Sequence, residues 1–253
     1  MTRRLHVPVV ALFALAPALA LAEVGEIEVL QGSGTRTPEG GKAEALKVGM
    51  KIDLKDVLVV DKGGNAKLVL ADESVLMVAG GSQLVINEAE FQGLERKGFS
   101  AKLLFGKVWA KVKKAAAGSD AKFEVTTDRA VAGVRGTVFR VDTKMFKAAV
   151  SGRPVQKSEK TIVRVWLGKV AVEATVKKIP DAQPAGGTSG KVRTLVQGPQ
   201  EISKDEWEKK FVELQKNMQV VIGDASFDTG ELKLDKGDAF AKFVDANAPA
   251  AQE

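Results

Sequence analysis

The strongest constraint on the fold is the regular recurrence of short apolar segments and turn signals from about residue 24 to residue 196. Short runs of valine, isoleucine and leucine alternate with turn signals at intervals of about eight to ten residues. The turn signals in the clearest stretch are the polar or glycine-rich segments 61–65, 71–74 and 80–82. This spacing is typical of β-sandwiches, barrels and solenoids, and it disfavours a parallel βαβ architecture. We therefore expect an all-β fold, either a short-stranded β-solenoid-like roll or a two-sheet sandwich.

Two similar segments, LFGKV at 104–108 and WLGKV at 166–170, lie within this region. Each pairs a glycine, Gly106 or Gly168, with a following strand. Glycine tolerates positive φ, so it fits a bulge or a tight corner where the chain folds back. A shared structural corner explains the similarity without any shared ligand.

The hydrophobic pattern of the sequence changes after residue 202. Ser203 and Glu206 have the spacing of a capping box at the start of a helix. Apolar residues then follow at spacings of four, three and four, which predicts one apolar stripe on a helix: Trp207, Phe211, Leu214 and Met218. We expect a C-terminal amphipathic helix over 203–222 that docks on a β domain at 23–202. Residues 223–253 are expected to form an extension that ends in a disordered tail.

The N-terminal segment predicts export. Arg3 and Arg4 precede an apolar run at 7–21, and Ala20-Leu21-Ala22 forms a cleavage pattern, so residues 1–22 are expected to be a cleaved signal peptide. No cysteine follows the run to carry a lipid, and no later apolar segment is long enough to span a bilayer. The mature chain is therefore expected in the periplasm, without a transmembrane span, although release from the cell is also compatible with the sequence.

Composition argues against catalysis. The single histidine, His6, lies in the expected leader, and the chain has no cysteine and no tyrosine. The mature chain therefore lacks the usual general bases, thiolate nucleophiles and commonest metal ligand, and we expect neither an enzyme nor a cofactor. Carboxylate chemistry remains as an alternative, with Asp72-Glu73 and Asp224 with Asp228 as nominal pairs. Scattered surface acids are the far commoner explanation for both pairs.

Charge gives a weaker indication of partners. Removal of the two leader arginines lowers the formal charge from +6 to +4, and the lysines are scattered among nearly as many carboxylates. Nucleic acid is not an expected partner of such an exported chain. A mild positive charge is compatible with contact to an anionic glycan, while an envelope protein is the partner that we expect first.

The most specific segment is FEVTTDRAVAGVRGTVFRV at 123–141. It resembles the core signature of the FecR-domain family, in which an F-x-V-x-T-P strand is followed by A-x-A-x-V and R-G-T-x-F-x-V, although Asp128 stands where the family usually has proline. Segments 51–57, 68–78, 104–108 and 163–172 are similar to further family motifs, so the resemblance covers roughly 24–202. In the motif itself we expect a mainly structural role for Arg135, Gly136, Thr137 and Phe139, because glycine permits a corner that threonine and arginine can brace.

The resemblance implies a periplasmic interaction domain. Named FecR-family regulators relay a signal from an outer-membrane receptor to a sigma factor through an anti-sigma segment and a membrane span, and no counterpart of either precedes the β region of this sequence. We therefore expect a non-catalytic envelope protein that acts as a protein-interaction or assembly module. A periplasmic signalling adaptor related to the sigma-factor regulators is the alternative.

A second alternative is a protein that binds peptidoglycan or another anionic glycan. Strand alternation places large aromatics beside cations on two strands, which would suit stacking on a sugar ring if they were exposed: Lys107, Trp109, Lys111, Arg164 and Trp166. The competing interpretation is that the tryptophans lie beneath the C-terminal helix, and the usual burial of large aromatics favours it.

Overall fold

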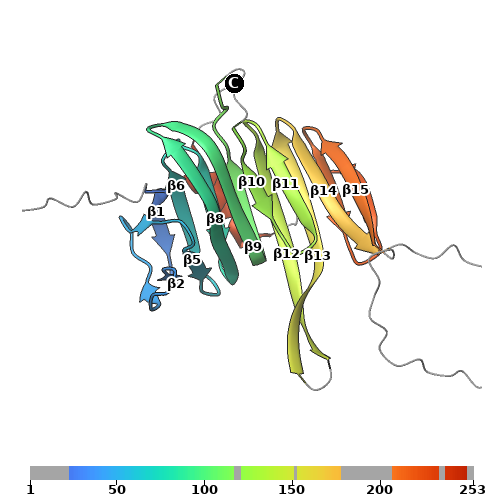
Figure 1. The fold of residues 1–253 in the computed structure, drawn as a ribbon, viewed down its shortest axis with the longest axis horizontal. Coiled ribbons are helices and arrows are strands. Elements are labelled where there is room, and N and C mark those ends of the chain that lie inside the picture. Colours follow the sequence, from blue (N-terminus) through green and yellow to red (C-terminus); the bar gives the residue numbers. More distant parts are fainter. Residues whose placement is uncertain (1–22, 117–120, 151–152, 178–206, 234–236, 250–253) are drawn as a thin grey trace, which may run out of the picture.

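The computed structural model describes residues 23–116, 121–150, 153–177, 207–233 and 237–249. Within these ranges the chain forms short and long strands and a single helix near the C-terminal end (Figure 1). The strands build two open sheets, so the expected all-β fold with two layers is confirmed. The expected signal peptide at 1–22 and the expected capping box at 203–206 lie outside the described residues.

The first sheet, sheet A, pairs its described strands antiparallel throughout. In spatial order its strands are β4 (Lys51–Ile52), β1 (Gly25–Gln31), β6 (Asn65–Leu70), β7 (Val75–Ala79), β9 (Glu95–Lys111), β12 (Val138–Val150), β13 (Arg153–Leu167), β16 (Met218–Ile222) and β17 (Phe227–Glu231).

The second sheet, sheet B, shares β9 with the first and contains one parallel pairing, between β9 and β10. Its order is β3 (Glu44–Ala45), β2 (Gly34–Thr37), β5 (Val57–Val60), β8 (Ser82–Gln92), β9, β10 (Glu124–Thr126), β11 (Ala130–Val134), β14 (Val170–Lys177) and β15 (Trp207–Leu214).

Strand β9 passes from one sheet to the other at Gly106. Residues up to Phe105 pair with β8 of sheet B, and residues from Gly106 onward pair with β12 of sheet A. The φ of Gly106 is 99°, and an added Cβ would lie 2.5 Å from the Cα of Ser82, so this close corner requires glycine. Gly168 (φ 80°) marks the passage from β13 to β14, which confirms that the two similar segments are corners.

The core lies between the two sheets. Alternating positions of the central strands point into one cluster, as in β6, where Ala66, Leu68 and Leu70 are buried and their neighbours are half-buried. Phenylalanines fill its centre: the rings of Phe99 and Phe123 stack with centroids 4.7 Å apart, and Phe139 meets Phe123 edge-on at 6.4 Å. The period-two pattern of the sequence therefore encodes two facing layers.

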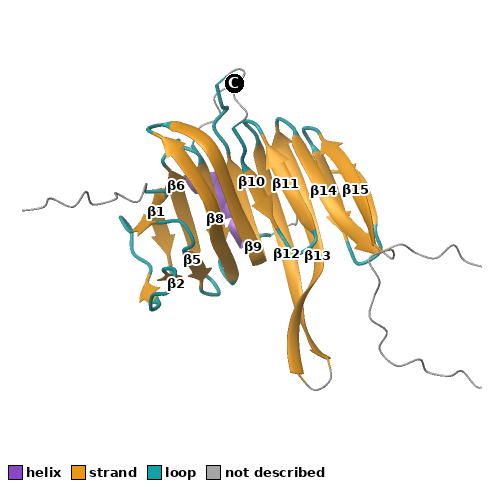
Figure 2. Cartoon of the chain, in the orientation of Figure 1, coloured by secondary structure: helices purple, strands orange, loops and turns teal. Residues whose placement is uncertain are grey.

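Helix α1 (Ala239–Asn247) covers the outer face of sheet A, and Figure 2 shows it behind the strands. Phe240, Phe243 and Val244 are its buried residues. They pack in a second apolar cluster with outward-facing side chains of sheet A, among them Met77 and Trp109. The molecule thus has a covered sheet on one side and, in the described residues, an uncovered sheet on the other.

Over the described residues 207–222 the expected helix is wrong. Trp207–Leu214 and Met218–Ile222 are strands β15 and β16, separated by a turn in which Asn217 has a φ of 63°. Within β15 the exposed Phe211 and Glu213 alternate with the half-buried Val212 and the buried Leu214, which is a strand period. The spacing of four, three and four therefore arose across a turn. The helix lies instead in the expected extension, at Ala239–Asn247.

The β12–β13 hairpin extends beyond both sheets (Figure 1). Its own backbone pairing continues to Val150 and Arg153, whereas pairing with β9 stops at Thr143 and pairing with β16 stops at Thr161. The outer part of the hairpin is therefore a two-stranded arm.

Candidate functional site

The signature segment 123–141 spans β10, β11 and the start of β12, so it crosses from sheet B to sheet A. Gly136 (φ 71°) turns the chain between the two sheets, and Arg135 lies exposed at the same corner. Thr137 is buried, and its hydroxyl donates a hydrogen bond to the carbonyl oxygen of Lys169 at 2.9 Å. Phe139 is fully buried in the core. These placements are those of residues that hold a corner together.

The signature corner packs against the corner at Gly168. A Cβ added to Gly168 would lie 2.9 Å from the carbonyl oxygen of Gly136 and 2.9 Å from the hydroxyl oxygen of Thr137. The two corners at which the chain crosses between the sheets are therefore in close contact, and a bulkier residue at Gly168 would push them apart. The motif fixes the position of the adjacent outer face of sheet B.

That outer face is hollowed beside the signature corner. Across four neighbouring strands the register aligns Glu124, Gly133, Ala171 and Glu213. Because the two central positions have little or no side chain, they form the floor of an open hollow of about 890 Å³, which also reaches Lys122 and Lys169. We call the exposed surface of β10, β11, β14 and β15 around this floor the open face; it mixes carboxylates, lysines and apolar groups.

The proposed glycan surface has a different location. Lys107, Trp109 and Lys111 do point away from the core strand positions Val108 and Ala110, but they point toward α1. Trp109 is 6% exposed and lies in the cluster beneath the helix, with Trp166 half-buried against it. Arg164 is also buried. The exposed aromatics that stacking on a sugar requires are absent from these positions, and burial under a helix explains them instead.

The buried cations of this face belong to an ion network that anchors α1. Asp142 accepts hydrogen bonds from Arg140 and from Arg164, each at 2.5 Å. Asp238, the N-cap of α1, accepts from the backbone N–H of Phe240 at 3.1 Å and pairs with Arg140 at 2.7 Å. Residues from β12, β13 and the helix N-terminus are thereby held together.

The network sets the charge state of the helix cap. Burial of the Asp238 carboxylate would raise its pKa, but hydrogen bonds and charges from Arg140 and Lys107 outweigh this effect and hold the pKa below its ordinary value. The Nζ of Lys107 lies 3.1 Å and 3.2 Å from the two carboxylate oxygens. Asp238 is therefore a charged latch residue between α1 and sheet A.

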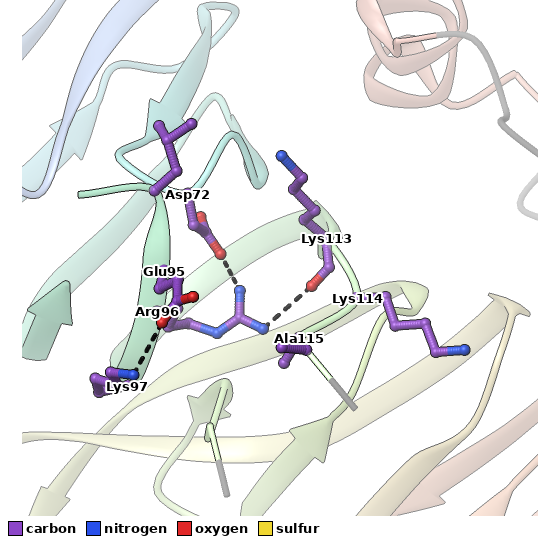
Figure 3. A pocket seen from close by; sticks show the side chains of 9 residues that line it. Asp72, Glu95, Arg96, Lys97, Lys113, Lys114 and Ala115 are labelled. Carbon is purple, nitrogen blue, oxygen red and sulfur yellow. Dashed lines mark hydrogen bonds and ion pairs between the residues drawn. The ribbon is translucent and has the colours of Figure 1, made fainter. Parts of the chain in front are cut away.

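A small pocket near the loop after β9 contains a second buried ion pair, which the sequence did not indicate (Figure 3). The guanidinium of Arg96 pairs with Asp72, donates to the carbonyl oxygen of Lys113 at 3.2 Å, and lies 5.2 Å from the ring centroid of Phe123. Burial lowers the pKa of Arg96, and Asp72 only partly offsets this. The Asp72 carboxylate also accepts from the Ser74 hydroxyl at 2.8 Å, so its oxygens are occupied by structural contacts.

The nominal carboxylate pairs do not form catalytic sites. Asp72 is buried in the ion pair just described, while its neighbour Glu73 is exposed and pairs with Lys113. Asp224 pairs with the buried Arg129, and Asp228 lies exposed on the edge strand β17. Within the described ranges, no group of three or more acidic, histidine or cysteine side chains is arranged to hold a metal ion.

Comparison with known proteins identifies the domain. Residues 56–171 match the family model described as "FecR protein", which is a family of regulators without enzymatic activity. No curated protein matches the chain significantly. The matched range contains the signature segment, both glycine corners and the floor of the hollow.

The comparison with solved structures found two similar chains from Parabacteroides distasonis. Two crystal structures, at 2.50 Å and 1.65 Å resolution, are described as a candidate anti-sigma factor. They are 18% and 17% identical to this chain, with a TM-score of 0.42 in both cases. The alignments cover 69% and 74% of this chain and 59% and 64% of those chains, so this chain spans less than two thirds of their length.

The family match coincides with the part of the structure that the signature segment organises, from the β5 strand to the first residues of β14. The sequence motifs at 123–141 and at both glycine corners are thus accounted for by one domain type. The chain therefore contains a FecR-family domain at residues 56–171.

Proposed function

We propose that this protein is a non-catalytic regulatory module of the cell envelope that binds another protein through the open face of sheet B. The observation that carries the proposal is the contrast between the two outer faces next to the signature segment. Helix α1 covers sheet A, whereas the FecR signature corner borders a hollow floored by Gly133 and Ala171. Family membership supports a regulatory role that works by binding.

The composition of the open face suits a protein surface as its ligand. Phe211 and Val131 supply apolar area at the hollow's edge, and carboxylates alternate with lysines around them. Four of these charges already form two ion pairs, with Lys169 2.8 Å from Glu213 and Lys209 2.7 Å from Glu173. A mixed apolar and charged surface of this kind gives specificity through complementary charges.

We further propose that the protein works in the periplasm after removal of residues 1–22, because the leader has the features of a secretory signal peptide. No helix in the described part of the chain is long and apolar enough to cross a membrane. Fractionation of cells that produce a C-terminally tagged chain, followed by mass determination of the product, tests both the compartment and the cleavage position.

The experiment that tests partner binding is site-specific photo-crosslinking in the native host. A photoreactive phenylalanine analogue at Ala171, in the floor of the hollow, is expected to capture a different envelope protein, which mass spectrometry identifies. The same analogue at Asp228, exposed on β17 of sheet A, is the matched control and should not capture that protein. Absence of any heterologous adduct at Ala171 would overturn the proposal.

A signalling role related to sigma-factor control is a second candidate, and the match to the FecR family is the observation that favours it. Under this proposal the captured partner is a membrane regulator or receptor, and deletion of the gene changes transcription of a defined set of genes. An unchanged transcript profile together with a captured structural envelope protein would favour assembly instead.

A further inference from the structure

The outermost strand of sheet B leaves one hydrogen-bonding edge open. Among the described strands, β15 pairs only with β14, so the backbone groups on its other side have no strand partner. An unpaired edge of this kind is a template for pairing with another chain. The strand is regular over Trp207–Leu214, and its pairing with β14 contains no register shift that would twist the edge away.

The side chains on the outer face of β15 have an order that suits self-pairing. Lys209, Phe211 and Glu213 alternate outward on this strand and all three are exposed. Phe211 is 68% exposed, which is the largest exposed fraction among the large apolar side chains that the structure describes. An aromatic side chain between a cation and an anion has the pattern of a strand that is complementary to its own antiparallel copy.

We propose that two copies of the protein associate by antiparallel pairing of their β15 strands, with Phe211 opposite Phe211 at the twofold axis. In this register Lys209 of one copy lies opposite Glu213 of the other, and the reciprocal pair forms on the other side of the axis. Sheet B then continues across the dimer, and the two open faces form one surface. This inference goes beyond the proposed function, because it concerns a second copy rather than a different protein.

Other registers lose either the continuity of the outer faces or the two favourable charge pairs. A shift of one residue in the pairing would place outward side chains opposite inward ones, so the outer faces would not be continuous. A shift of the axis by two residues in either direction places Lys209 opposite Lys209, or Glu213 opposite Glu213, and like charges directly opposite each other destabilise a strand pair. The register centred on Phe211 avoids these like-charge contacts and gives two favourable pairs.

The existing ion pairs extend this pattern. Within one copy, Glu213 is paired with Lys169, and Lys209 is paired with Glu173. Across the proposed interface the charges would therefore form a row of alternating sign. The row consists of Lys169 and Glu213 of one copy, followed by Lys209 and Glu173 of the second copy. The row needs no rearrangement within either copy.

Sedimentation velocity over a range of protein concentrations tests the association. The wild-type protein is expected to show a reversible monomer–dimer equilibrium, and Phe211→Ser should raise its dissociation constant by about tenfold or more. Leu94→Ser is the matched control, because Leu94 is 64% exposed in the turn between β8 and β9. A wild-type protein that stays monomeric at the highest concentration, or an equal effect of the two substitutions, would overturn the proposal.

Cysteine cross-linking tests the register, and the absence of natural cysteines makes each introduced thiol unique. Phe211→Cys should form a disulfide-linked dimer under mild oxidation, because position 211 faces itself. Lys209→Cys should not link to itself but should link to Glu213→Cys when the two variants are mixed. More rapid self-linking of Lys209→Cys than of Phe211→Cys would overturn the register. A monomeric protein would leave partner capture at Ala171 unaffected, so the two proposals fail separately.

Discussion

The outer faces of the two sheets have the same alternating strand pattern, but one face is covered by a helix and the other is open. On sheet A the outward positions carry Met77, Trp109 and Trp166, and α1 covers them. On sheet B the outward positions carry Gly133, Ala171 and charged groups, and the described chain leaves them open. Alternation alone therefore shows which side chains point outward, while residue size and a distant helix decide whether they become core or surface.

The charges on the two faces differ in the same way. Asp142 on sheet A is nearly buried between two guanidinium groups, so its role is tied to folding. Glu173 on sheet B pairs with an exposed lysine, Lys209, whose side chain is 68% exposed. Exposed pairs contribute little to stability and remain available to partners, whereas a buried charge must keep its partners. The covered face thus stabilises the molecule and the open face is available for binding.

The largest effect that separates the faces is expected from aromatic truncation. Trp109→Ala should lower the free energy of unfolding by about 3–5 kcal/mol, because it leaves a cavity beneath α1. Phe211→Ala, on the open face, should change it by less than about 0.5 kcal/mol, because the ring is mostly in solvent. Urea unfolding followed by circular dichroism, at a concentration where the protein is monomeric, measures both. Similar losses for the two variants would contradict the assignment of covered and open faces.

The burial of Trp109 illustrates a limit of prediction from sequence. Period two correctly separates Trp109 from Val108 and Ala110, but a strand pattern cannot reveal what covers its second face. The cover comes from α1, and the Lys107 contact with its cap spans 131 residues in sequence. The signals that could have located this helix are Asp238 as a cap and the i, i+3, i+4 spacing of Phe240, Phe243 and Val244.

The expected helix at 203–222 illustrates a different limit, because a helical spacing of apolar residues can arise by chance in two neighbouring strands. Phe211 and Leu214 fit a helical stripe by spacing, yet in β15 they point to opposite sides of the strand. A turn at Asn217 separates Met218 from them, so the apparent stripe combines residues of two strands. The corners at Gly106 and Gly168 were predictable because positive φ is a local requirement, whereas the ion pair of Arg96 with Asp72 depends on a tertiary contact.

The second largest effect is expected from the buried charges. Asp142→Asn removes the charge of the carboxylate that Arg140 and Arg164 share and should cost about 3 kcal/mol, because a charged acceptor between two buried guanidinium groups is lost. Glu173→Gln on the open face is the matched substitution and should cost no more than about 0.5 kcal/mol. The two variants are compared by urea unfolding at neutral pH. A small cost for Asp142→Asn would mean that the network is not essential for holding sheet A together.

A smaller effect concerns the latch at the N-terminus of α1. The folded-state pKa of Asp238 lies below its ordinary value, so its ion pairs stabilise the folded protein fully above about pH 4 and lose this contribution as the pH falls through the folded pKa. Asp238→Asn keeps a capping side chain but removes the charge. It should cost about 1–2 kcal/mol at pH 7, and the difference from wild type should shrink below pH 4.

Thermal unfolding of both proteins between pH 3 and pH 7 measures this dependence. Glu213→Gln provides the control on the open face, and its difference from wild type should stay small across the range because its ion pair is exposed. A constant difference between Asp238→Asn and wild type would show that the charge of Asp238 does not fasten α1.

The smallest effect on stability should come from filling the hollow of the open face, where we propose that the partner binds. A Cβ at Gly133 would meet only the carbonyl oxygen of Ala171, at 3.9 Å, and the backbone there needs no positive φ, so Gly133→Val should change the free energy of unfolding by less than about 0.5 kcal/mol. The added side chain should nevertheless reduce capture of a partner by the photoreactive group at Ala171. Gly133→Ala, with a smaller side chain, should reduce it less. If both variants capture the partner as well as the unsubstituted chain does, the floor of the hollow is not where the partner binds.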